Sequence, residues 1–96
     1  MNEWQRLTRQ AEHYKNLYPE GTRVICEYMN DNMHPVPSGT RGTVEFVDDL
    51  GTIHCRWDNG QGLGLAPNED KFRKLTDQEL LEELEKKQID NDEIDY

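Results

Sequence analysis

Hydrophobic residues recur every three or four positions at the start of the chain, with polar and charged residues between them. This spacing places them on one side of a helix and predicts an amphipathic helix over about residues 2–17. Asn2, followed by Gln5, is suited to cap its start, and Pro19 ends it because the residue before a proline avoids helical backbone. The stripe consists of Trp4, Leu7, Ala11, Tyr14 and Leu17.

Residues 18–75 change to a period of two, interrupted by turns that contain glycine. Such alternation predicts strands, because successive side chains of a strand point to opposite faces. The pair Asn59-Gly60 predicts a hairpin turn of type I′. Five short strands between such turns favour a mainly β fold, a small SH3-like barrel whose sheet closes on itself. The strands are expected at about residues 23–29, 42–47, 52–57, 62–65 and 72–75.

The third of these strands shows the alternation most clearly. Ile53, Cys55 and Trp57 share one face, whereas His54 and Arg56 lie on the other. We therefore expect Trp57 in the core and His54 and Arg56 at the surface.

The last part of the chain returns to a helical pattern. Thr76 with Glu79 three residues later forms a capping box, which predicts a helix over about residues 77–87. The acidic stretch at residues 88–96 is expected to be mobile unless a partner orders it. The helix carries a narrow apolar stripe of Leu80, Leu81 and Leu84.

Charge is distributed unevenly along the 96 residues, whose formal net charge is −9. Residues 76–96 hold nine acidic residues against Lys86 and Lys87, a net charge of −7. Such a segment repels phosphate and attracts basic surfaces. The predicted organisation is an N-terminal helix at residues 1–17, a barrel at 18–75, and an acidic helix with a mobile tail at 76–96.

The two cysteines, Cys26 and Cys55, both fall in predicted strands without the spacing of a metal site. The N-terminus opens an amphipathic pattern rather than a secretory signal, and no apolar run approaches the roughly 20 residues that span a bilayer. We therefore expect a cytoplasmic protein with two reduced thiols and no membrane association. A Cys26–Cys55 disulfide is the alternative.

Six short motifs mark the turns and strands of residues 18–75: YPEGTRV at 18–24, GTRGTV at 39–44, GTIH at 51–54, WDNG at 57–60, LGL at 63–65 and DKFRK at 70–74. Together they resemble a small SH3-like-barrel domain of unknown function found in phage and mobile elements of Gram-positive bacteria. The resemblance implies that fold and a mobile-element setting, and it brings no activity, cofactor or catalytic residue.

No group of residues indicates an enzyme, a metal site or a cofactor. His13, His34 and His54 lie in separate elements without neighbouring ligands. The pair Asp48-Asp49 suits a turn better than acid–base catalysis. Residues 60–64 are rich in glycine but lack the lysine and the helix of a phosphate-binding loop. We therefore expect a protein that binds without catalysing a reaction.

A protein partner is the expected ligand, because both apolar helix stripes need a covering surface. A small acidic protein can also occupy the basic channel of a host defence nuclease by presenting carboxylates in place of phosphates, and anti-CRISPR proteins are often of this size and charge. Alternatively the stripes pack on the barrel or form a homodimer, and the acidic tail only aids solubility. The candidate partner-binding residues are Trp4, Leu7, Tyr14, Leu80, Leu84, Glu79, Glu82, Glu83, Glu85, Asp90, Asp92 and Glu93.

The alternative function is nucleic-acid binding by the barrel. Arg41, His54 and Arg56 lie on or beside adjacent predicted strands, and small barrels use basic and aromatic faces to hold single strands. The excess of acidic residues over basic ones in residues 20–75 argues against it.

Overall fold

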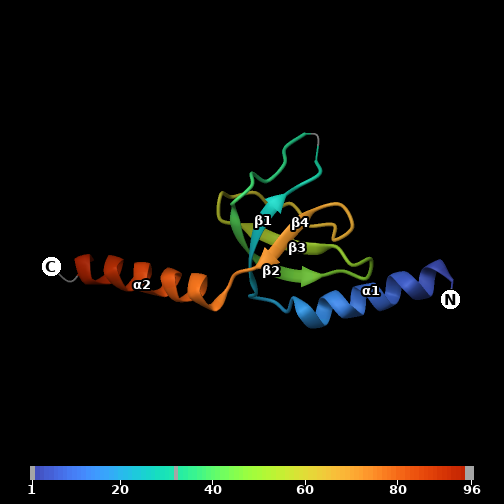
Figure 1. Ribbon diagram of the computed structural model, residues 1–96, viewed down its shortest axis with the longest axis horizontal. Coiled ribbons are helices and arrows are strands. Elements are labelled where there is room, and N and C mark those ends of the chain that lie inside the picture. Colours follow the sequence, from blue (N-terminus) through green and yellow to red (C-terminus); the bar gives the residue numbers. More distant parts are fainter. Residues whose placement is uncertain (1, 32, 95–96) are drawn as a thin grey trace.

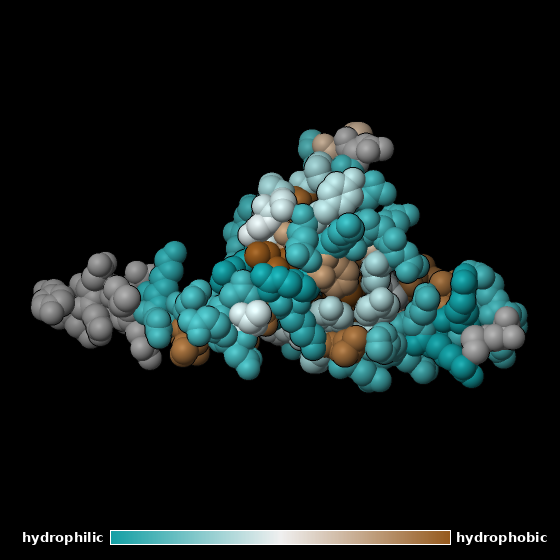
Figure 2. Space-filling view, viewed as in Figure 1, coloured by the Kyte–Doolittle hydropathy of each residue, from teal (hydrophilic) through white to brown (hydrophobic). Residues whose placement is uncertain are grey.

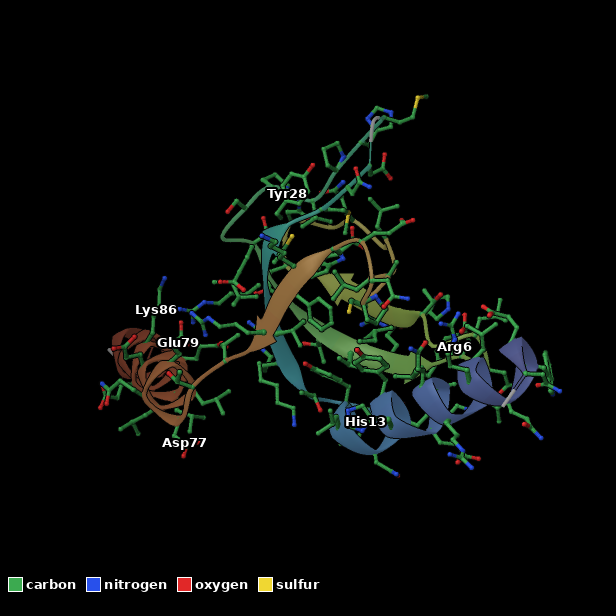
Figure 3. The ribbon with its side chains drawn as sticks, turned by 45° about the vertical axis from the view of Figure 1, so that its right-hand side comes forward. Arg6, His13, Tyr28, Asp77, Glu79 and Lys86 are labelled. Carbon is green, nitrogen blue, oxygen red and sulfur yellow. The ribbon has the colours of Figure 1, made fainter. Side chains whose placement is uncertain are left out.

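The computed structural model describes residues 2–31 and 33–94, with side chains through residue 86. Within these residues the chain forms a four-stranded antiparallel sheet with a helix at each end (Figure 1). The two helices extend away from different sides of the sheet (Figures 1 and 3). In chain order the elements are α1 (Glu3–Leu17), β1 (Arg23–Tyr28), β2 (Arg41–Val47), β3 (Ile53–Trp57), β4 (Lys71–Lys74) and α2 (Asp77–Ile94).

The strands lie in the order β3-β2-β1-β4, so β1 pairs with both the next strand and the last one. Val24 of β1 stands opposite Gly42 of β2 on one side and Lys74 of β4 on the other. β2 and β3 form a hairpin with a bulge between Val44 and Phe46. The N-terminal and C-terminal strands of the sheet are therefore direct neighbours.

Two expectations about the sheet need correction within the described residues. Four strands form rather than five, and β3 and β4 are the edges of an open sheet rather than neighbours in a closed barrel. Residues 62–65, expected as a strand, contribute a single bridge in which Leu65 and Ile53 exchange backbone hydrogen bonds of 2.8 and 2.9 Å. Gly62 and Gly64 explain the loss, since glycine has no side chain to pack and loses the most backbone entropy.

The turn after β3 also differs from the expected type I′ turn. Gly60 has a φ of +95°, but Asn59 does not adopt a positive φ. The N–H of Gly60 donates to the carbonyl of Trp57, and the N–H of Trp57 donates to the carbonyl of Gln61, both at 2.9 Å. These bonds define a three-residue loop in which glycine supplies the left-handed position after a type I turn.

The core lies under one face of the sheet and includes Trp57, which is only 1% exposed, as predicted. Its indole Nε1 donates a hydrogen bond of 2.7 Å to the carbonyl of Leu63 and so holds the segment after the hairpin. Both cysteines are buried here as free thiols rather than as the alternative disulfide. The remaining core residues are Val24, Met29, Val36, Val44, Val47, Ile53 and Leu65.

α1 begins as predicted, because the side chain of Asn2 accepts a 2.8 Å hydrogen bond from the N–H of Gln5. Its middle packs on the body through Ala11, which is buried, and Tyr14, which stacks on Tyr18. Its first turn does not pack in this way, since Trp4 is 68% exposed. Only part of the predicted apolar stripe of α1 therefore packs against the body of the protein.

α2 begins with the predicted capping box, in which Thr76 Oγ1 accepts from the N–H of Glu79 and Glu79 Oε1 accepts from the N–H of Thr76. The predicted end near residue 87 is wrong, because the helix continues to Ile94. Residues 88–94 contain no glycine or proline that would stop it. Neither described helix combines the length and apolar character needed to cross a membrane.

Candidate functional site

Four arginines gather on the face of the sheet opposite the core, which we call the outer face. Alternation along each strand directs Arg23 of β1, Arg41 of β2, Arg56 of β3 and Arg73 of β4 outward, while Val24, Gly42, Cys55 and Trp57 are buried and Phe72 packs on the core. The register aligns them in two rows. Arg41 and Arg73 both stand opposite Ile25, and Arg23 and Arg56 both stand opposite Thr43.

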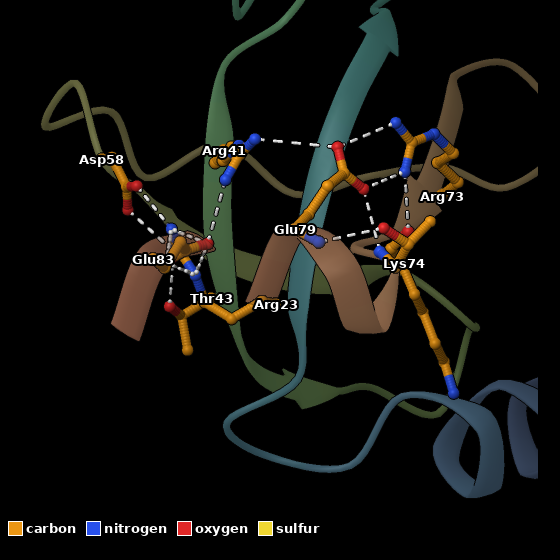
Figure 4. A network of polar contacts seen from close by, with 9 residues as sticks. Arg23, Arg41, Thr43, Asp58, Arg73, Lys74, Glu79 and Glu83 are labelled. Carbon is orange, nitrogen blue, oxygen red and sulfur yellow. Dashed lines mark hydrogen bonds and ion pairs between the residues drawn. The ribbon is translucent and has the colours of Figure 1, made fainter. Parts of the chain in front are cut away.

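The first two turns of α2 lie over three of these arginines (Figure 4). Glu79 contacts Arg73 at 2.7 Å and Arg41 at 3.6 Å. Glu83 contacts Arg41 at 3.3 Å and Arg23 at 3.1 Å. Because residues four apart share one face of a helix, a single face of α2 presents both carboxylates to the sheet.

Arg23 has further partners on the body of the protein. Its Nη1 and Nη2 atoms donate to the two carboxylate oxygens of Asp58 at 2.9 and 2.7 Å, and Nη1 also donates to Thr43 Oγ1. The hydrogen bonds to Asp58 raise the pKa of Arg23, and the same contact lowers the pKa of Asp58. Asp58 therefore neutralises part of the charge of Arg23 independently of α2.

Glu79 joins the helix cap to the arginine contacts. Its hydrogen bonds with Arg73 and with the N–H of Thr76 lower the pKa of Glu79 from 4.5 to about 2. Its side chain is only 18% exposed. One carboxylate therefore both starts α2 and fixes the position of α2 on the outer face.

An aromatic pair lies further along the outer face, past the bulge in β2. The rings of Phe46 and His54 are stacked, with centroids 4.3 Å apart and planes 11° apart, and Phe46 is 54% exposed. His54 Nε2 lies 2.8 Å from the carboxylate of Asp48. The neighbouring Arg56 side chain is 79% exposed and contacts Glu45 at 3.4 Å.

The apolar residues predicted to bind a partner fall into two groups. Leu7 and Tyr14 are partly buried against the body. Trp4, Leu80 and Leu84 are exposed, Leu84 at 59%. Figure 2 shows hydrophobic surface on the α2 arm, separate from the hydrophobic surface of the body.

The predicted acidic residues also divide. Glu79 and Glu83 face the protein's own arginines, and Figure 3 shows Glu79 near the start of α2. Glu82 and Glu85 are exposed. The side chains of the other three predicted acidic residues, Asp90, Asp92 and Glu93, lie outside the described residues.

The structure places Arg41, His54 and Arg56, the residues of the alternative function, on one face. Sequence reasoning missed Arg23, Arg73 and the exposed ring of Phe46. Alternation along β1 could have indicated Arg23, whereas Arg73 required the pairing of β4 with β1. Phe46 required the bulge, which turns it outward after Glu45.

The described part of the chain offers few other groups that could bind a metal ion or act as a nucleophile. It contains no group of three or more His, Cys, Asp or Glu side chains able to hold a metal ion. Burial raises the pKa of the Cys55 thiol to about 12, and burial also raises that of Cys26. Neither thiol is a ready nucleophile at neutral pH, because the thiolate is the reactive form.

The fold and the outer face together define a small antiparallel-sheet domain with a charged contact between its last helix and its sheet. The chain belongs to the family described as "Domain of unknown function (DUF4314)", whose profile matches residues 8–75. The match begins within α1, earlier than the expected start at Tyr18, and ends just before α2. No curated protein matches the chain.

Proposed function

We propose that this protein is a non-enzymatic binding module that engages a protein partner through the exposed apolar side of α2. The observation that carries the proposal is the exposure of Leu80, Leu81 and Leu84 on a helix whose other side is held to the sheet by ion pairs. An amphipathic helix of this kind docks into an apolar groove of its partner.

The charge of α2 favours a particular class of partner. Glu82 and Glu85 flank the leucines and are exposed, so a groove with a basic rim is the best electrostatic complement. Nucleic-acid enzymes carry such basic surfaces. We propose an inhibitor of a host defence nuclease, such as a CRISPR effector, encoded by a phage or another mobile element.

The fold and the location belong to the same proposal. The order β3-β2-β1-β4, with Leu65 bridged to β3, supports an SH3-like topology that is open between its edge strands, with the fourth expected strand reduced to one bridge. Two buried free thiols support a cytoplasmic location, where cysteines remain reduced.

The test uses three full-length proteins as baits in a bacterial lysate: the unaltered chain, a variant and a control. Any nuclease that a bait retains is then tested in a cleavage assay. The variant is Leu80→Ala/Leu84→Ala, and the control is Leu50→Ala, which removes a leucine of the body that is 66% exposed. We expect a basic nuclease to be retained and inhibited by the unaltered chain and the control but not by the variant. Replacing Glu82 and Glu85 with glutamine should weaken inhibition at low salt, and inhibition by this variant should depend less on salt than inhibition by the unaltered chain.

Two results would contradict the proposal. One is that all three baits retain and inhibit the same enzyme, which would place recognition away from the stripe. The other is a dimer, measured by light scattering, that Leu80→Ala/Leu84→Ala converts to a monomer, because a second copy would then cover the leucines.

A further inference from the structure

We propose that the outer face of the sheet binds the backbone of single-stranded nucleic acid, and that α2 covers this face by placing Glu79 and Glu83 where phosphates would lie. This inference is independent of the protein partner proposed above, since it concerns the side of α2 that faces the sheet rather than the exposed leucines.

Positive charge on the outer face supports the first part. Arginine presents a planar fork of donors that matches phosphate as well as carboxylate. Among the described residues, the carboxylates that contact Arg41 and Arg73 come only from α2. Displacement of α2 would therefore free two guanidinium groups of the same row, which lie on the strands that flank β1.

The positions of the α2 carboxylates also indicate how far apart two anions can lie when they bind these arginines. Glu79 and Glu83 are one helical turn apart, and their carboxylates contact arginines on three different strands (Figure 4). The phosphates of single-stranded nucleic acid repeat at regular intervals, so several arginines of the sheet can each contact one phosphate. The α2 carboxylates thus act as stand-ins for two successive phosphates.

Aromatic surface on the same face favours nucleic acid over an acidic peptide. The exposed ring of Phe46, stacked on His54, offers a platform for a base, and stacking on aromatic side chains is how sequence-tolerant single-strand binders hold bases. Arg56 lies between this pair and the arginines under α2, beside an open hollow of about 280 Å³ that Thr43 and Glu45 also line. An acidic peptide would gain nothing from the aromatic pair.

The contacts between α2 and the outer face allow the helix to be displaced. Ion pairs and hydrogen bonds join it to the outer face, while Leu81 and Leu84 are 49% and 59% exposed. Such pairs are weak when partly exposed and are screened by salt. The cover also explains why an arginine-rich face occurs in an acidic chain, because nine of the 20 acidic residues follow residue 75.

The test measures the affinity of the full chain for a fluorescein-labelled oligothymidylate of about 20 nucleotides by fluorescence anisotropy. The variant Glu79→Gln/Glu83→Gln removes the two covering charges, and glutamine at position 79 keeps the capping box. The matched control is Glu82→Gln/Glu85→Gln, which removes the same charge from exposed positions of the same helix.

We expect the variant to bind at least about tenfold more tightly than the unaltered chain at low salt, and the control to change affinity by less than about twofold. Adding Arg41→Ala to the variant should reverse the gain and reduce the salt slope of binding by about 0.7. Equal tightening by variant and control would overturn the proposal, since it would reflect net charge alone. Tightening by neither would overturn it as well.

An NMR titration of the unaltered chain provides a second test that needs no substitution. Adding the same oligothymidylate at low salt should shift the amide signals of β1, β2 and the first two turns of α2 together, because binding displaces the helix. Shifts confined to other parts of the chain, or none at all, would contradict the proposal. The outcome does not depend on Leu80 or Leu84, so the two proposals can fail separately.

Discussion

Arg23 and Glu83 are 60 positions apart in the sequence, and Arg23 Nη2 lies 3.1 Å from Glu83 Oε2. The contact joins the first strand of the sheet to the second turn of the last helix. The side chains of Arg23 and Glu83 are 20% and 31% exposed, so the pair is partly buried and still open to screening by salt. α2 is therefore held in place by specific long-range contacts rather than only by its connection to β4.

Acid should loosen the start of α2 through Glu79. The pKa of Glu79 in the folded protein is about 2, below its ordinary value of 4.5, so its ionised form stabilises the folded state. That contribution is complete above pH 4.5 and is lost as the pH falls towards 2. The protection factors of amides in the first turn of α2, which correct for the intrinsic change of exchange rate with pH, should fall over this range. In Glu79→Gln this dependence on pH should disappear, whereas Glu82→Gln should retain it.

Gly42 should tolerate no side chain. A Cβ there would lie 2.6 Å from Trp57 Cε3 and 3.0 Å from the carbonyl oxygen of Arg56. We expect Gly42→Ala to lower the free energy of unfolding by about 1–3 kcal/mol in urea denaturation. Gly62→Ala is the control, because a Cβ at Gly62 meets nothing within 4 Å, and its effect should stay within about 0.5 kcal/mol. Equal effects would show that Trp57 can move aside.

Asp48 should matter to stability and Asp49 should not. Asp48 Oδ1 accepts hydrogen bonds from the N–H groups of Leu50 and Thr52 at 2.9 and 3.0 Å, whereas Asp49 makes one exposed ion pair with Lys15. Burial opposes ionisation of Asp48, but its hydrogen bonds with His54 and the backbone outweigh this and lower its pKa. We expect Asp48→Ala to cost about 1–2 kcal/mol and Asp49→Ala less than about 0.5 kcal/mol, by urea denaturation.

The two thiols should resist modification in the folded protein. Cys26 and Cys55 are buried, and burial raises the pKa of Cys55 to about 12, so almost no thiolate is present at pH 8. Mass spectrometry should find iodoacetamide adducts on neither thiol of the native chain and on both in urea. Rapid labelling of the native chain would mean that the sheet opens readily.

Short-range features were predictable because they depend on neighbours in the sequence. The cap at Asn2, the capping box of Thr76 and Glu79, and the burial of Trp57 follow from a few adjacent residues. The absence of a full strand after Gly60 was not predictable, because it depends on whether glycine-rich backbone finds enough packing partners.

The candidate site was partly predictable for the same reason. Alternation alone indicated that His54 and Arg56 share a face. The approach of Glu83 to Arg41, 42 positions earlier, depends on where α2 leaves the sheet, and no local pattern encodes that. Apart from Glu79 in the capping box, the acidic residues of α2 were consequently interpreted as a surface for other molecules or as an aid to solubility.

The central position of β1 has a consequence for how the chain is made. One edge of β1 can pair with β2 once residue 47 has left the ribosome, but its other edge must wait for Lys71–Lys74. A nascent chain of 70 residues therefore exposes an unpaired strand edge, the kind of surface on which incomplete sheets aggregate. Translation of β4 closes that edge, and α2 emerges directly afterwards.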